Sequence, residues 1–387
     1  MINLIFFLIA AVCFLTCFYC FLIGTYIAGW LRLSVWKTSP QFKPQTTVTL
    51  IVPARNEAAV ITTCLQSIVS QHYPVELLEV IIVDDYSTDA TAGIVQEWVK
   101  QYPHIQLLRL QEHLPDSTPL NSYKKKAIQT AIGLSRNELI ITTDADCFAS
   151  PDWLLNITAF YEEHRPKMIA APVCFTHEQT FFERFQTLDF IGMMVSTGAS
   201  VHLGLAGMCN GANLAYTRQA FKDVNGFAGI DHLASGDDML LMAKITERFP
   251  KQTLFLKNYE ATVFTTPQPT LSTFANQRIR WASKSAQYQD KRITLYLAFV
   301  FLFNVSLLLN FGLWLTGFSV AGHLLAAQLL AKLIADFTYL GVGAHFFNRS
   351  KLLWLFLPAQ VLHILYIVLI GILGNLGKYT WKDRVVR

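Results

Sequence analysis

Two aspartates follow a run of apolar, β-branched residues in the first half of the chain. Asp144 and Asp146 come after Leu139–Thr143 (LIITT), which has the composition of a buried strand. Residues two apart in an extended chain point to the same side, so both carboxylates can face one ligand. Carboxylates bind hard divalent cations, which take their remaining ligands from water or a diphosphate. Such a pair can also cap a turn, and these residues alone leave both interpretations open.

Two pairs of adjacent acids offer further carboxylates. Asp84 and Asp85 end the apolar run VIIV, and Asp237 and Asp238 begin a helical run in the stretch SGDDMLL. The first pair could accept hydrogen bonds from a nucleoside base or ribose, or cap the next helix. The second pair could hold a general base close to a substrate hydroxyl, or cap its own helix.

A basic and aromatic helix contributes a third kind of group. Gln277, Arg280 and Trp281 (QRIRW) have the spacing i, i+3 and i+4, which places them on one helix face. A guanidinium can pair with two phosphate oxygens, and an indole offers a flat apolar surface on which a sugar can stack. A basic interfacial helix anchored by tryptophan would have a similar composition.

Alternating strands and helices are predicted to position these groups. Continuous apolar strands separated by helices indicate a mostly parallel sheet covered on both faces, with ligands at the carboxyl ends of its strands. The chain has no GxxxxGK[ST] loop and no GxGxxG between a strand and a helix. The predicted strands are Thr47–Val52, Val80–Val83, Ile105–Leu110 and Leu139–Thr143, and the predicted helices are Ala58–Gln71, Ala90–Gln101 and Lys124–Leu134.

The composition indicates a membrane protein. The 387 residues are 52% apolar and 15% charged, whereas about a quarter of the residues of a soluble domain are charged. The net charge is only +4, whereas a nucleic-acid binder has a strongly basic surface, so no nucleic-acid partner is expected. Lys332 and Asp336 make one of the apolar segments the least certain span, although they are spaced to pair. The segments long enough to cross a bilayer are 1–36, Thr294–Phe318, Ser319–Phe347 and Leu352–Leu376.

The predicted organisation is an α/β domain flanked by transmembrane helices. Its parts are an anchor at 1–36, a domain at 37–292, two or three transmembrane segments at 293–376 and a basic tail at 377–387. Lysines and arginines next to the spans predict that the domain is cytoplasmic. Amphipathic stretches at about 181–194 and 270–288 are predicted to lie in the membrane interface, or to face the core.

The order of these motifs resembles the membrane-integrated family 2 glycosyltransferases. That family includes the cellulose, hyaluronan and poly-N-acetylglucosamine synthases and the ceramide glucosyltransferases. The stretches VPARNE, IIVDDYSTDAT, ITTDAD and QRIRW carry the resemblance, which runs from about Thr47 to Trp281. It implies an α/β, GT-A-like (Rossmann-like) domain, Mg²⁺ or Mn²⁺ as cofactor, and a nucleotide-sugar donor, with a UDP-sugar favoured.

The resemblance also implies roles for the acids on the donor side. Asp84 or Asp85 would contact the base and ribose of the nucleotide, with Glu57 nearby. Asp144 and Asp146 resemble the donor-binding pair, in which the metal ion bridges the carboxylates and the diphosphate.

On the acceptor side, Asp238 matches the base that takes the proton of the acceptor hydroxyl, and Asp237 stands where relatives often have Glu. Lys124 or Lys125 resembles a family lysine that follows a glycine, a place that Tyr123 takes in this chain. Asn213, in the stretch NGAN, belongs to a loop expected near the acceptor. The QRIRW motif resembles the segment that closes over diphosphate and acceptor.

The implied reaction is a single, inverting displacement at the anomeric carbon. The acceptor would be a lipid or a growing glycan, in contact with membrane lipids, and the protein would be integral to a bacterial-type inner membrane with its catalytic domain in the cytoplasm. A processive polysaccharide synthase is the alternative within this class. Outside it, a membrane metal-dependent phosphohydrolase could use the same acids, and the Lys332 and Asp336 pair would suit a transporter.

Overall fold

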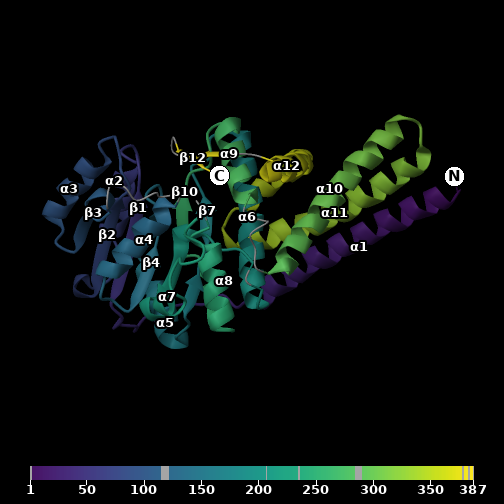
Figure 1. Ribbon diagram of the computed structural model, residues 1–387. Helices are drawn as coiled ribbons and strands as arrows, with labels where there is room; N and C mark the ends of the chain where they lie inside the picture. Colours follow the sequence, from purple (N-terminus) through teal and green to yellow (C-terminus); the bar gives the residue numbers. More distant parts are fainter. Residues whose placement is uncertain are drawn as a thin grey trace. The chain divides into compact units, whose positions relative to one another are not determined.

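The computed structural model describes residues 2–114, 122–205, 207–233, 236–283, 290–376, 379–381 and 384–386. They form two compact units (Figure 1). We call the first the sheet unit, which comprises Leu33–Glu178, Ser200–Pro267 and Lys378–Arg387. We call the second the helical unit, which comprises Met1–Arg32, Gln179–Ala199 and Gln268–Gly377.

A seven-stranded sheet in the order β3-β2-β1-β4-β8-β6-β9 forms the centre of the sheet unit. The pairs β1–β2, β2–β3, β1–β4 and β6–β9 are parallel, and β8 runs antiparallel to both of its neighbours. The predicted mostly parallel sheet is therefore confirmed. Its strands are β1 (Val48–Ala54), β2 (Leu78–Asp84), β3 (Ile105–Arg109), β4 (Leu139–Thr142), β6 (Met168–Ala170), β8 (Leu214–Thr217) and β9 (Thr253–Phe255).

Burial on both faces explains why the central strands are continuously apolar. Leu50, Ile51 and Val52 of β1 are successive residues that point to alternate faces, and each is 0% exposed. In register with Leu50 lie Val80 of β2 and Ile141 of β4. A sheet buried in this way fixes its register, because a slip by one residue would exchange every side chain between the two faces.

Helices and a small second sheet complete the sheet unit. The helices predicted after the first three strands are present with ends within three residues of those expected. The small sheet has the order β5-β10-β7. The helices are α2 (Ile61–Val69), α3 (Thr91–Gln101), α4 (Tyr123–Leu134), α5 (Trp153–His164), α7 (Arg218–Asp223) and α8 (Met239–Arg248), and the small strands are β5 (Phe148–Ala149), β7 (Val173–Phe175) and β10 (Val263–Thr265). Residues after the last helix form the hairpin β11 (Tyr379–Trp381) and β12 (Arg384–Val386).

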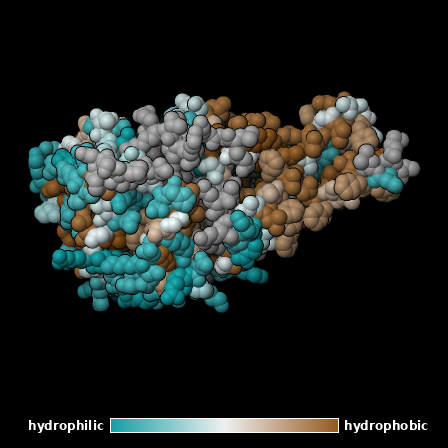
Figure 2. All heavy atoms as spheres, viewed as in Figure 1, coloured by the Kyte–Doolittle hydropathy of each residue, from teal (hydrophilic) through white to brown (hydrophobic). Residues whose placement is uncertain are grey.

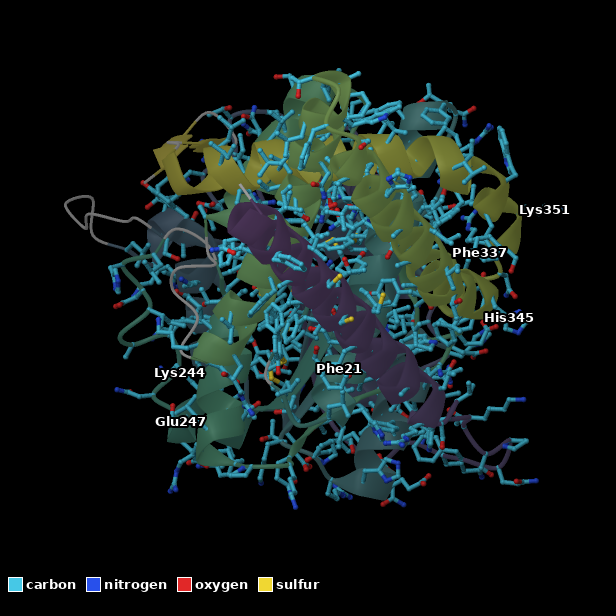
Figure 3. All side chains as sticks on the ribbon, turned by 90° about the vertical axis from the view of Figure 1, so that its right-hand side faces the viewer. Phe21, Lys244, Glu247, Phe337, His345 and Lys351 are labelled. Atoms are coloured by element: carbon cyan, nitrogen blue, oxygen red, sulfur yellow. The ribbon has the colours of Figure 1, made fainter. Side chains whose placement is uncertain are left out.

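Among its described residues, the helical unit contains four helical segments that are long and apolar enough to cross a membrane: Ile5–Arg32, Lys291–Leu315, Ser319–Phe346 and Ser350–Gly374. Figure 2 shows hydrophobic residues gathered over these helices. Phe21 and Phe337, labelled in Figure 3, are 70% and 48% exposed, as expected for side chains that contact lipid. The unit is built from α1 (Ile2–Arg32), α6 (Phe181–His202), α9 (Leu271–Ala282), α10 (Lys291–Leu315), α11 (Ser319–Phe346) and α12 (Phe356–Leu376).

Buried polar contacts join the long helices. Lys332 Nζ of α11 lies 2.5 Å from Asp336 Oδ2, and the Tyr19 hydroxyl of α1 donates to Asp336 Oδ1 at 2.6 Å. Asn310 of α10 donates to Gln328 of α11 at 2.7 Å. Unpaired polar groups are costly in hydrocarbon. Because Lys332 and Asp336 are paired, their two charges are compatible with a segment that has the length and apolarity of a span.

The amphipathic stretch at about 181–194 lies in α6, and the one at about 270–288 forms α9 over Leu271–Ala282, while its residues 284–288 lie outside the described residues. Phe185 of α6 and Phe274 of α9 are buried in one apolar cluster with Leu355 and Ala359. The ring centroids of Phe185 and Phe274 are 6.3 Å apart in an edge-to-face arrangement. Each stretch therefore has one apolar side that packs against other helices of the same unit.

Candidate active site

The acids that follow β2 and β4 lie at one edge of the sheet, because these strands and β1 between them are parallel. Asp84 is the last residue of β2, and Asp84 and Asp85 are 4% and 2% exposed. Arg55 Nη1 donates to the carbonyl oxygens of Asp85 and Tyr86 at 2.9 and 2.8 Å, which ties the loop after β1 to the loop after β2. Asp84 Oδ1 is buried and has no hydrogen-bond partner among the described residues.

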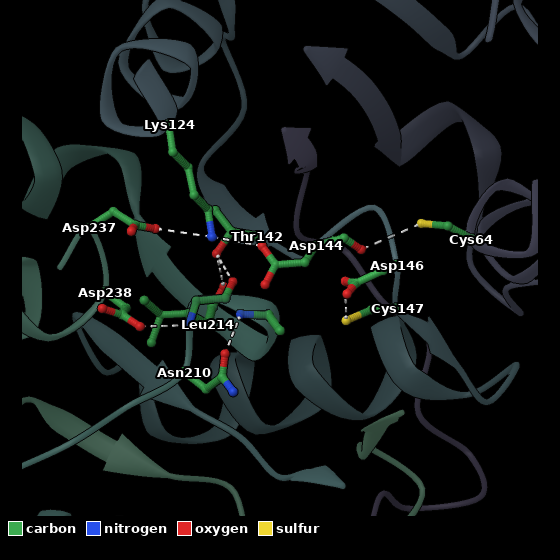
Figure 4. A network of polar contacts seen from close by, with 12 residues as sticks. Cys64, Lys124, Thr142, Asp144, Asp146, Cys147, Asn210, Leu214, Asp237 and Asp238 are labelled. Atoms are coloured by element: carbon green, nitrogen blue, oxygen red, sulfur yellow. Dashed lines mark hydrogen bonds and ion pairs between the residues drawn. The ribbon is translucent and has the colours of Figure 1, made fainter. Parts of the chain in front are cut away.

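Lys124 connects two of the predicted acidic groups. Its ammonium, from the first turn of α4, lies 2.7 Å from Asp144 Oδ1 and 3.3 Å from Asp237 Oδ2 (Figure 4). Burial opposes the charge, but Asp144, Asp237 and Asp238 together raise the pKa of Lys124 well above its usual value. The lysine is therefore a permanent cation that links the acid after β4 to the acids before α8.

Asp238 is the N-cap of α8. Its Oδ1 accepts a hydrogen bond from Met239 N at 2.7 Å, and its Oδ2 accepts one from Gly211 N at 3.2 Å. The capping function that the sequence left open is thus present. A Cβ at Gly211 would lie 3.2 Å from Asp237 Oδ2 and 3.5 Å from Lys124 Nζ, so the glycine permits the close approach of this loop to the charged groups.

Asp144, Asp146 and Cys147 form a group whose possible ligand atoms lie within 4.8 Å of one another. The Cys147 thiol donates to Asp146 Oδ1 at 3.5 Å. Burial and the neighbouring Asp146 and Asp144 raise the pKa of the Cys147 thiol well above its usual value. Hard divalent cations prefer oxygen ligands, so the two carboxylates are the donors of this group that suit such an ion.

Glu57 lies in the turn between β1 and α2. Its backbone N–H donates to Thr91 Oγ1 at 2.8 Å, and its carbonyl accepts from Val60 and Ile61 at the start of α2. Burial first, and then Asp146, Asp144 and Glu57, raise the pKa of the Cys64 thiol. That coupling places the Glu57 carboxylate in the same electrostatic neighbourhood as the aspartates after β4.

Two of the predicted binding residues make structural contacts in this structure, and their part in binding a substrate stays a prediction. Lys125 is 2% exposed and donates to the carbonyls of Ile230 and Leu233 at 2.6 and 2.7 Å. Asn213 is 0% exposed, and its amide nitrogen donates to the carbonyls of Pro172 and Ala261 at 2.7 and 2.8 Å. Both side chains fasten loops, because a buried polar group must be paired within the protein.

The Gln277, Arg280 and Trp281 motif lies on α9 of the helical unit, whereas the acids belong to the sheet unit. Gln277 Oε1 is buried without a hydrogen-bond partner among the described residues. The Trp281 ring centroid lies 6.0 Å from that of Phe190 and 4.5 Å from the guanidinium carbon of Arg278.

Sequence reasoning missed the groups around this motif. Arg278 is paired with Asp189 of α6, at 2.8 Å. The signal was present in the sequence, since Asp189 is an acid in the middle of the apolar run TLDFIGMM and Arg278 is the second residue of QRIRW.

Two family models match the chain. The model described as Glycosyl transferase family 2 matches residues 49–224. The model described as Glycosyl transferase family group 2 matches residues 139–373, which is more than half of the chain. The two matched regions together include the sheet strands, the acids and the QRIRW motif.

Similar curated proteins are glycosyltransferases by name. A Beta-monoglucosyldiacylglycerol synthase of Nostoc sp. is 31% identical over 118 residues, which cover 30% of this chain and 24% of that protein. Glycosyltransferase AglE of Haloferax volcanii is 27% identical over 52% of this chain and 61% of its own length. An N-acetylglucosaminyltransferase of Mesorhizobium japonicum is 26% identical over 76% of this chain and 67% of its own length. The chain thus spans about a quarter of the first relative.

Among solved structures, the mannosyltransferase PcManGT from Pyrobaculum calidifontis, in complex with GDP-Man and Mn²⁺, has a similar fold. The TM-score is 0.61, the sequence identity is 21%, and the match covers 97% of this chain and 98% of that one. The likeness therefore includes the apolar helices as well as the sheet.

Proposed function

The chain belongs to the family 2 glycosyltransferases, and from this premise we propose that it transfers a sugar from a nucleotide-sugar donor to a lipid acceptor at a membrane. The observation that carries the proposal is the position of Lys124. One ammonium contacts Asp144, which follows β4, and Asp237, which precedes α8. This contact supports a single site in which groups for the donor and groups for the acceptor lie next to each other.

The nucleotide is proposed to bind at the acids after β2. The free, buried Oδ1 of Asp84 is suited to accept a hydrogen bond from a base or ribose, because a buried acceptor is costly while it lacks a donor. Asp85 and Glu57 border the same loop pair, which Arg55 holds in place. A UDP-sugar is the favoured donor, and the solved relative with GDP-Man makes a GDP-sugar the first competitor.

Asp144 and Asp146 are proposed to hold Mg²⁺ or Mn²⁺, because their carboxylate oxygens lie in one group and are the donors that suit a hard divalent cation. Bound there, the ion would offset the charge that grows on the departing diphosphate. Lys124 supplies a second positive charge at Asp144, and its raised pKa keeps that charge at any physiological pH. The relative solved with Mn²⁺ supports a divalent ion in this fold.

Asp238 is proposed to take the proton of the acceptor hydroxyl. The hydroxyl oxygen forms a bond to the anomeric carbon while the bond from that carbon to the phosphate oxygen breaks, and the electron pair leaves with the nucleoside diphosphate. A single displacement inverts the anomeric centre. Asp237 faces Lys124, so its charge is already partnered, and Asp238 is the better placed of the two to act as base.

A lipid acceptor is favoured over a growing polysaccharide. The four apolar helices bring the chain to a membrane, and the Nostoc relative is named as the synthase of a glucosylated diacylglycerol. Gln277, Arg280 and Trp281 are proposed to close over the diphosphate and the acceptor sugar. In the proposed topology the sheet unit faces the cytoplasm of a cell with a bacterial-type inner membrane.

The test is the Asp238→Asn variant in the full-length protein, reconstituted in lipid. Loss of a general base should reduce transfer by about 10²–10⁴-fold, while calorimetric binding of the sugar nucleotide stays near that of the wild type. The matched control is Asp223→Asn, which changes an exposed acid of α7 that accepts a hydrogen bond from Gln219. Transfer by Asp238→Asn within a factor of about ten of the wild type would contradict the base assignment.

A further inference from the structure

The indole of Trp281 is held by an arginine in the same helix. The guanidinium carbon of Arg278 lies 4.5 Å from the Trp281 ring centroid and 4.8 Å from that of Phe274. Trp281 is three residues after Arg278 and Phe274 is four residues before it, so the three side chains lie on one face of α9. A guanidinium between two aromatic rings gains cation–π attraction from both.

The arginine is in turn fixed by two groups from other helices of the same unit. Its Nη2 lies 2.8 Å from Asp189 Oδ2 of α6, and the two side chains are only 4% and 5% exposed. The Tyr366 hydroxyl of α12 donates to Asp189 Oδ1 at 2.6 Å. The Tyr366 hydroxyl therefore holds one carboxylate oxygen by a hydrogen bond, Arg278 lies within ion-pair distance of the other, and α6, α9 and α12 meet at one charged pair.

A buried ion pair stabilises a fold weakly, because taking two charges out of water offsets most of their attraction. Its value lies in position, since a buried guanidinium that lies beside two aromatic rings and a carboxylate has little freedom to move. The ring beside it is then restricted as well. A surface on which a sugar stacks needs this restriction, because a displacement of about 1 Å can reduce a rate by about 10²-fold.

We infer that Arg278, clamped by Asp189 and Tyr366, is a positioning residue that holds the Trp281 indole ready for the acceptor sugar. The inference rests on the proposed function, in which Trp281 contacts that sugar. It adds three residues that act through the indole and touch neither donor nor acceptor themselves.

The test follows the Trp281 ring directly. Protein labelled with 5-fluorotryptophan has eight signals, and the one missing from Trp281→Phe belongs to Trp281. In Arg278→Gln and in Asp189→Asn this signal should shift and broaden, and kcat should fall by about 10–100-fold while KM for the sugar nucleotide is unchanged. Tyr366→Phe removes one hydroxyl. It should change the Trp281 signal and kcat in the same direction, but by less.

Asp336→Asn is the matched control, because it breaks a different buried salt bridge of the helical unit, the one between Asp336 and Lys332. It should leave the Trp281 signal in place. An unchanged signal in Arg278→Gln, or an equal change in Asp336→Asn, would overturn the inference. If instead Trp281→Phe transfers sugar at the full rate, the proposed function of Trp281 fails, while the signal in Arg278→Gln still decides whether the clamp exists.

Discussion

The chain contains two Lys–Asp clusters of nearly the same chemistry, one in each unit. In the sheet unit, the Lys124 and Asp144 side chains are 22% and 35% exposed, and the lysine also reaches Asp237. In the helical unit, the Lys332 and Asp336 side chains are 1% and 8% exposed, and Tyr19 completes their hydrogen bonds. The first cluster is open to a ligand and has more acids than bases, whereas the second is closed and neutral.

This difference distinguishes a candidate binding site from an ion pair that serves the structure. A partly exposed cluster with surplus carboxylates can exchange protein contacts for a metal ion, a diphosphate or a hydroxyl. A buried ion pair in an apolar helix bundle cannot exchange its contacts in this way, because a charge that leaves its partner there is costly. Removal of one carboxylate should therefore affect chemistry in the first cluster and stability in the second.

The largest effect is expected for Asp144→Asn. Loss of a proposed metal ligand and of the partner of Lys124 should lower transfer by about 10³-fold or more, with little change in the melting temperature. Transfer should likewise disappear on chelation with EDTA and return with Mn²⁺ or Mg²⁺. The measurement is nucleoside diphosphate release together with thermal unfolding. Full activity in excess EDTA would remove the metal from the account.

The reciprocal effect is expected for Asp336→Asn. The buried Lys332 would lose its counter-charge, which destabilises a protein by about 3–5 kcal/mol. The melting temperature in detergent should fall clearly, while the folded fraction keeps its rate of transfer. Asp336→Asn with an unchanged melting temperature and a strongly reduced rate would show that the pair takes part in function.

A smaller effect on stability is expected for Tyr19→Phe. This change deletes the hydroxyl that donates to Asp336 at 2.6 Å but keeps the ring, which stacks on Phe303 with a centroid distance of 4.1 Å. The loss of one buried hydrogen bond should reduce the free energy of unfolding by about 1 kcal/mol. A reduction as large as that of Asp336→Asn would mean that the Tyr19 hydroxyl contributes as much to stability as the counter-charge of Lys332.

A pH-dependent effect on stability is expected from one buried lysine of the sheet unit. Lys257 is 7% exposed, donates to the Leu33 carbonyl at 3.0 Å, and has its pKa lowered by burial to about 8. Above that pH the folded chain has released a proton that the unfolded chain holds until about pH 10.4, so the free energy of unfolding should rise with pH in this window.

In Lys257→Met this rise should be absent, whereas Lys222→Met, which changes an exposed lysine of α7, should keep it. Thermal unfolding at several values between about pH 8 and about pH 10 is the measurement. If the free energy of unfolding still rises with pH in Lys257→Met, another titrating group causes the rise.

The sheet was predictable because its central strands are apolar on both faces. Strands of three or four residues, such as β6, β8 and β9, are too short to show a period, so the antiparallel β8 and the small second sheet were not predicted. The ends of α3 and α4 were predicted within one residue, whereas α2 begins three residues later and ends two residues earlier than predicted. The pairing of Lys332 with Asp336 was predictable from their spacing of four, but the Tyr19 contact depends on how α1 packs.

The sequence predicted which residue types the site contains, but it did not predict which of them contact one another. Neighbouring lysines on a helix point about 100° apart, so the sequence offered Lys124 and Lys125 equally. The fold turns Lys124 to the acids and Lys125 to the carbonyls of Ile230 and Leu233. In the same way, the burial of Asn213 depends on the loop residues Pro172 and Ala261, which lie far away in the sequence.

The most direct test of the central claim is transfer itself. The purified protein in lipid nanodiscs should be given UDP- and GDP-sugars labelled in the sugar, with Mn²⁺ and membrane lipids as acceptors. We predict that one donor releases its nucleoside diphosphate and that equal label enters a lipid product carrying one sugar. Label in a high polymer would favour the processive synthase, and release of phosphate or free sugar without any glycosylated product would contradict the account.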